Sequence, residues 1–137
     1  MIRFHARFKA ACAAVLMLAT SAASAGPIAV VVHKDAPAPT QAEIADVYLG
    51  KSQALKPLDA PEGSPLRADF YRKLTGRDAA QIKSMWSRIV FTGKGSPPKE
   101  AADAAAVKAA VAADAKAIGY LDKAAADSSV KVVLTLD

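Results

Sequence analysis

An uninterrupted apolar run, Ile28 to Val32, is the feature that most constrains how this chain can fold. The run is rich in β-branched residues and lacks the alternating polar side chains of a half-exposed strand, so it predicts a strand buried on both faces of a sheet. Strand-like and helix-like patterns alternate along the rest of the chain. The sequence therefore predicts an α/β domain with a mixed, mostly parallel sheet flanked by helices.

Capping residues and apolar spacing locate the other elements. Apolar residues at helical spacing are clearest from Ile82 to Val90, where Trp86 is expected to anchor the core. Thr40 followed by Glu43 has the spacing of a capping box. We predict helices that begin near Thr40, Ser64, Asp78 and Glu100, and further strands over residues 55–58, 118–121 and 130–134.

Residues 1–25 have the pattern of a secretory signal peptide. Three basic residues and no acid precede a short apolar run, and Ala23-Ser24-Ala25 offers a cleavage site. Cleavage after Ala25 would leave residues 26–137 as a single mature domain and lower the formal net charge from +5 to +2, because the three basic residues leave. It would also remove Cys12, the only cysteine. The expected location is the bacterial periplasm.

Several function classes are disfavoured by what the mature chain lacks. A net charge of +2, with no basic stripe and aromatic residues at core spacing, argues against nucleic-acid binding. No metal-ligand spacing, cofactor motif or nucleophile elbow occurs. His33 would be the only histidine of the mature chain, and it is interpreted either as a polar residue at a strand end or as a catalytic base. We expect a protein that is not an enzyme and that uses no cofactor or metal.

The loop over residues 59–67 is the first candidate anion site. It leads from a possible strand into a helix, where Gly63, Ser64, the backbone amides of Leu66 and Arg67, and the Arg67 side chain would offer donors to an anion. The alternative is an ordinary helix cap at Ser64 with a solvated Arg67.

A second glycine-rich loop covers residues 91–98. Its glycines permit conformations in which successive amides converge on one anion, and Lys94 adds positive charge. The alternative is a simple connection between two helices. If the strands are parallel, His33, the loop over 59–64 and Tyr120 would share the carboxyl edge of the sheet, where ligands bind in open α/β folds.

Three segments, in order, resemble the phosphate-binding components of ABC phosphate transporters. AEIADVYLGK over residues 42–51 is similar to the LADIFLGK segment of that family, and AIGY over 117–120 matches its AIGY strand. The segment over 61–70 occupies the place of its RxDGSGT stretch, with Ser64 at the position of the phosphate-contacting serine. Ala60, Glu62 and Leu66 stand where the family has Arg, Asp and Thr.

The resemblance implies a periplasmic-binding-protein-like fold, and the chain has the length of one lobe. It also implies an exported, non-catalytic solute-binding protein for phosphate or a related oxyanion. A membrane transporter, or a second protein that completes the site, would be its partner. The expected ligand contacts are Gly63, Ser64, Leu66, Arg67 and Lys94. The alternative is an interaction or regulatory module that keeps the fold without the ligand.

Overall fold

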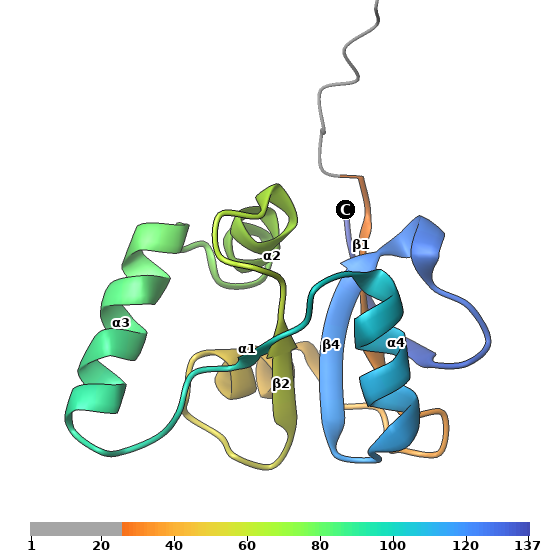
Figure 1. Cartoon of the computed structure of the whole chain (residues 1–137), viewed down its shortest axis with the longest axis horizontal. Helices are drawn as coiled ribbons and strands as arrows, with labels where there is room; N and C mark the ends of the chain where they lie inside the picture. The colour runs from red at the N-terminus through yellow and green to blue at the C-terminus, as the bar shows by residue number, and fades with distance from the viewer. Residues whose placement is uncertain (1–25) are drawn as a thin grey trace, which may run out of the picture.

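The computed structural model describes residues 26–137, so the expected signal peptide lies outside the described residues. Within them a five-stranded sheet in the order β3-β2-β4-β1-β5 is flanked by helices (Figure 1). In chain order the elements are β1 (Ile28–Val32), α1 (Gln41–Tyr48), β2 (Lys56–Asp59), α2 (Pro65–Thr75), α3 (Ala79–Phe91), β3 (Lys99–Glu100), α4 (Ala104–Ala113), β4 (Ala117–Asp122), the short 3-10 helix η1 (Lys123–Ala125) and β5 (Lys131–Leu136). No helix of this part of the chain is long and apolar enough to cross a membrane.

The helices start where capping residues predict, with one exception. The Thr40 hydroxyl accepts a hydrogen bond from the Glu43 amide, and the Glu43 carboxylate accepts one from the Thr40 amide. These two bonds complete the predicted capping box of α1. The expected start of a helix at Glu100 is wrong. Glu100 belongs to the short strand β3, and the Asp103 carboxylate instead caps α4 by accepting the Ala106 amide.

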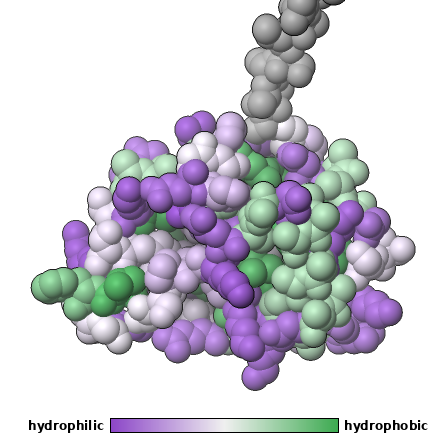
Figure 2. Space-filling model, viewed as in Figure 1, coloured by the Kyte–Doolittle hydropathy of each residue, from purple (hydrophilic) through white to green (hydrophobic). Residues whose placement is uncertain are grey.

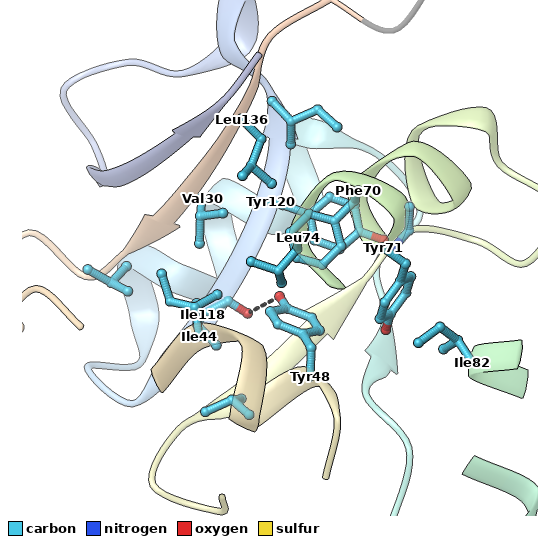
Figure 3. Packing of buried hydrophobic residues seen from close by; sticks show 14 of the residues in the cluster. Val30, Ile44, Tyr48, Phe70, Tyr71, Leu74, Ile82, Ile118, Tyr120 and Leu136 are labelled. Atoms are coloured by element: carbon cyan, nitrogen blue, oxygen red, sulfur yellow. Dashed lines mark hydrogen bonds between the residues drawn. The ribbon is translucent and has the colours of Figure 1, made fainter. Parts of the chain in front are cut away.

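The buried character of β1 is confirmed, since every one of its residues is buried. Its side chains divide between two apolar clusters on opposite faces of the sheet. Val30 and Val32 belong to the cluster that includes residues of α1, α2 and α3, which Figure 3 shows in part. Ala29 and Val31 belong to the other cluster, which is covered by α4. Helices therefore cover both faces, as a doubly buried strand requires.

Strand direction makes the sheet mixed, which confirms the predicted α/β architecture. β2 is parallel to β3 and β4, whereas β1 is antiparallel to both β4 and β5. Parallel pairing is therefore limited to β2 and its two neighbours. The end of β2 at Asp59 and the second half of β4 at Tyr120 share one edge, which we call the carboxyl edge. The expectation that His33 joins them is wrong, because the antiparallel β1 places its last residues at the opposite edge.

Aromatic rings fill the core beneath the carboxyl edge. The Phe70 ring is stacked on Tyr120 with centroids 3.7 Å apart, and Tyr48 meets Phe70 edge-on at 4.8 Å (Figure 3). The Tyr48 hydroxyl donates to the Leu58 carbonyl at 2.8 Å, which ties α1 to β2. The three rings come from α1, α2 and β4, so this cluster joins the helices to the sheet next to the candidate anion loop.

Candidate functional site

The loop that follows β2 presents the start of α2 to solvent. Gly63 has a φ of +84°, a conformation that favours glycine, and the Ser64 amide donates to the Pro61 carbonyl at 3.0 Å. Pro65 is the first helical residue, as predicted. Within residues 26–137 the Ser64 side chain makes no capping hydrogen bond. The first-turn amides of Leu66 and Arg67, which have no intrahelical acceptor, lie at the same helix end as Ser64.

Arg67 is turned inward and held by two carboxylates. Its Nε lies 3.4 Å from Asp59 Oδ2, and its Nη1 lies 3.1 Å from Glu100 Oε1. The same Nη1 donates to the Ala60 carbonyl at 3.2 Å. The solvated arginine considered from the sequence is therefore not what the structure contains. The guanidinium crosses from α2 to the ends of β2 and β3, next to the helix start.

Asp59 is the buried centre of this arrangement, with 1% of its surface exposed. The Tyr71 hydroxyl donates to Oδ2 at 2.7 Å, and the Tyr120 hydroxyl donates to Oδ1. The Ala60 amide in turn donates to the Tyr120 oxygen at 2.9 Å. We call Asp59, Arg67, Tyr71, Glu100 and Tyr120 the Asp59 cluster.

Burial dominates the electrostatics of the cluster. Burial raises the pKa of Asp59, while the two tyrosine hydrogen bonds and the Arg67 charge act against that rise. Burial and the neighbouring Asp59 charge raise the pKa of both Tyr71 and Tyr120. Both tyrosines therefore stay protonated near neutral pH and keep donating to Asp59.

Asp59 lies within the candidate loop over residues 59–67, but no sequence pattern indicates a role for Asp59, Tyr71 or Glu100. One local signal was available, because Arg67 and Tyr71 lie four residues apart and so share a face of α2. That face meets Asp59. Glu100 carried no such signal, since it reaches Arg67 only through the pairing of β3 with β2.

The rim of the helix start carries a further ion pair. Glu62 Oε1 lies 2.8 Å from Lys83 Nζ, and this contact lowers the pKa of Glu62. The Glu62 amide donates to Glu100 Oε1 at 3.2 Å, so Glu100 joins the loop to Arg67. An anion at Ser64 would thus meet one arginine that is already paired with carboxylates.

The structure separates Lys94 from the other candidate residues. The Lys94 amide donates to the Ile89 carbonyl, and its carbonyl accepts the Gln53 side-chain amide at 3.3 Å. The segments that precede and follow β2 leave it at opposite ends (Figure 1). Lys94 contacts Gln53, which precedes β2, whereas Ser64 follows β2. Gly63, Ser64, Leu66 and Arg67 lie together at the carboxyl edge.

Among residues 26–137, no three His, Cys, Asp or Glu side chains are grouped so that they could hold a metal ion.

Comparison with known proteins identifies the fold. No family model matches the chain, and no curated protein matches it. An ABC-type phosphate transport receptor from Vibrio cholerae aligns with a TM-score of 0.59 at 17% identity, over 77% of this chain and 44% of that one. A putative phosphate ABC transporter substrate-binding protein with bound phosphate, from Clostridium perfringens, aligns with a TM-score of 0.61 at 23% identity, over 77% of this chain and 43% of that one.

The likeness concerns the fold, and it covers only part of each neighbour. The chain spans less than half the length of either solved structure. Its own mixed sheet, with helices on both faces, agrees with that match. The chain therefore has an α/β fold similar to that of part of these two solved structures, as expected for a periplasmic-binding-protein-like lobe.

Proposed function

We propose that this chain is a non-catalytic solute-binding lobe that takes phosphate or a related small oxyanion at the start of α2. The observation that carries the proposal is the Ser64 hydroxyl, free of any capping bond within the described residues, at the start of the helix whose first turn carries Arg67. The fold is shared with two proteins whose names describe phosphate transport or binding.

Binding there would use donors that the helix leaves unpaired. The amides of Leu66 and Arg67 lie, together with Ser64, at the positive end of the α2 dipole, where anions are stabilised. Arg67 adds a charge-assisted contact if an incoming oxyanion replaces Glu100 at Nη1, which lies 3.1 Å away. Because Glu100 competes for that contact, we expect weak binding by the lobe alone.

A second protein that covers the bound anion would raise the affinity for phosphate. The match spans less than half the length of either structural neighbour, and one open lobe leaves a bound ion exposed to water. A membrane transporter or a second copy of the chain would supply the missing wall. Affinity depends on how completely such a site is enclosed and preorganised.

Calorimetric titration of the protein with sodium phosphate, and separately with sodium sulfate, tests the proposal. We expect saturable heat with phosphate at or below about 10 mM, which corresponds to roughly 3 kcal/mol of binding free energy. Ser64→Ala should weaken binding about tenfold, equivalent to the loss of about 1.4 kcal/mol from one hydrogen bond. Ser84→Ala, the same change at an exposed position of α3, is the matched control. Absence of heat with phosphate, or equal affinity in the two variants, would refute the site.

Export belongs to the same proposal, since a periplasmic-binding-protein-like lobe would meet its solute outside the cytoplasm. Expression of the full chain in a Gram-negative bacterium should yield a periplasmic product whose mass corresponds to residues 26–137. Ala25→Glu, which places a charge at the cleavage site, should leave the precursor uncut. A product that retains Met1 and stays in the cytoplasm would contradict the assignment.

A protein-interaction module is the second candidate function, and one surface observation favours it. Phe91 is 92% exposed and Val90 is about half exposed at the end of α3. Apolar atoms lie at this end of the molecule, at the left edge of Figure 2. Exposed aromatic side chains are frequent anchors of protein interfaces. This candidate would be supported if the protein gave no heat with phosphate and formed an oligomer in light scattering that Phe91→Ser abolished.

A further inference from the structure

A cavity of about 620 Å³ lies at the other end of β2 from the Asp59 cluster. The end of α1, the residues that precede β2, Trp86 of α3, the 95–98 segment and α4 form its walls. We call it the Trp86 cavity. Its volume falls within the range of pockets that hold small organic ligands, about 300–1000 Å³. Lys94 and its glycine loop, which the proposed anion site does not use, belong to this end of the molecule.

Close packing holds the residues around the cavity in place in the absence of a ligand. Gly50 has a φ of +74°, and a Cβ at this position would lie 2.9 Å from Ile89 Cδ1 and 3.1 Å from Trp86 Cη2. The α1 end therefore packs directly against the indole ring. Gln53 ties the segment before β2 to the glycine loop through its hydrogen bond to the Lys94 carbonyl. A ligand would enter a preformed pocket with little ordering cost.

The lining combines flat apolar surfaces with an excess of positive charge. Trp86, Leu55 and the rings of Pro97 and Pro98 provide apolar area, and prolines contribute no backbone donor that would need a partner. The charged residues of the lining are Lys56, Lys99 and Asp114.

Those three charges leave one lysine available. Lys56 Nζ and Asp114 Oδ2 lie 3.2 Å apart and neutralise each other. Lys99 takes part in no ion pair among the residues that the structure describes. A ligand that complements the cavity therefore has an apolar, preferably planar body and one negative charge.

We propose that the Trp86 cavity is a second binding site, for a small aromatic carboxylate. The ring of the ligand lies against Trp86 and the two prolines, and its carboxylate pairs with Lys99. The site is separate from the anion site at α2, because its lining ends at Leu58 on β2 and includes no residue of the Asp59 cluster.

The single tryptophan of the sequence makes the proposal directly measurable. Titration of the purified full chain with sodium benzoate should change the Trp86 emission saturably, with a Kd at or below about 1 mM. Inorganic phosphate should not displace benzoate, which separates this site from the proposed oxyanion site. An emission that benzoate leaves unchanged up to about 10 mM, or displacement of benzoate by phosphate, would overturn the proposal.

Two helix variants give a matched comparison. Ala110 lines the cavity whereas its neighbour Ala109 on α4 is exposed, so Ala110→Leu fills the pocket and Ala109→Leu does not. Benzoate affinity should fall at least about tenfold in Ala110→Leu and stay within about twofold in Ala109→Leu. Circular dichroism checks that both variants fold. Equal affinity in the two folded variants would overturn the assignment of the cavity.

Two further measurements test whether the ligand's carboxylate is recognised by Lys99. Lys99→Gln should weaken benzoate binding about tenfold, and benzamide, which has the same ring without the charge, should bind about tenfold more weakly than benzoate to the unchanged protein. Benzamide binding as tight as that of benzoate would overturn the carboxylate as the recognised group.

Discussion

The two ends of β2 differ in how their polar groups are satisfied. At the carboxyl edge, the Asp59 cluster pairs its charges and hydroxyls with one another inside the chain. At the other end, the Trp86 cavity leaves about 620 Å³ of space and an available lysine. Both regions adjoin loops rich in Gly, Ser and Pro that look alike in the sequence. Loop composition therefore predicted where donors occur, and only tertiary contacts determined whether the chain already uses them.

The largest effect is expected where the core meets the carboxyl edge. Phe70 is fully buried and stacked on Tyr120, so Phe70→Ala should lower the free energy of unfolding by about 3–5 kcal/mol in urea denaturation. The same substitution at the exposed Phe91 should change it by less than about 0.5 kcal/mol. Similar losses at the two positions would mean that Phe91 is also buried, in an oligomer.

The Asp59 cluster should be intolerant of losing one donor. Tyr71→Phe removes the hydroxyl that donates to a buried carboxylate, which we expect to cost about 1–3 kcal/mol of unfolding free energy. In an Asp59→Asn background the cost should shrink, because the partner charge is gone. A double-mutant cycle in urea measures this coupling. Additive losses would show that Tyr71 acts through packing alone.

At the Trp86 cavity, alanine substitutions at Gly50 and Gly95 should have different effects on stability, because only Gly50 has a positive φ and a crowded Cβ position. Gly50→Ala should cost about 1–2 kcal/mol, since the residue has a positive φ and its Cβ would crowd Ile89 and Trp86. Gly95→Ala should leave stability within about 0.5 kcal/mol, because its φ is ordinary and its nearest contact would be 3.4 Å. Thermal or urea unfolding compares them. Equal losses would mean that the 95–98 segment is as constrained as the end of α1.

The smallest effect is one of pH, and its sign should differ between the two regions. Burial raises the pKa of Asp59 above its usual 3.8, so the folded protein holds that proton more tightly than the unfolded chain does. Its contribution to stability is complete below pH 3.8 and is lost as the pH rises through the raised value. The Lys116 amide and the Lys56 side chain lower the pKa of Asp114, so its contribution is present above pH 3.8 and is lost as the pH falls.

Comparing each Asp→Asn variant with the unchanged protein across the acid range isolates these two contributions. Unfolding free energies between pH 3 and pH 6 should show that the unchanged protein loses stability relative to Asp59→Asn as the pH rises, and gains it relative to Asp114→Asn. The hydrogen bonds from Tyr71 and Tyr120 act against the rise in the Asp59 pKa, so the change in stability with pH should be small for Asp59. Slopes of the same sign would contradict the different environments of the two carboxyls.

Local features of the fold could be predicted because they depend on residues that are close in the chain. The capping box of α1, the start of α3 near Asp78, Pro65 at the start of α2 and the doubly buried β1 all follow from short patterns. β3 could not be predicted, since two residues form a strand only by pairing with β2. The antiparallel direction of β1 could not be predicted either, because a buried apolar run is compatible with both parallel and antiparallel pairing.

The candidate site divides in the same way. The sequence by itself determined the donors at the start of α2, the likeness of three segments to phosphate-transporter proteins and the helix-flanked sheet. Only the tertiary structure decided that Arg67 is paired with Asp59 and Glu100, and that Lys94 lies away from Ser64 beside a cavity. The physical reason is that capping and periodicity act over a few residues, whereas ion pairs and cavities depend on strands and helices that are distant in the chain.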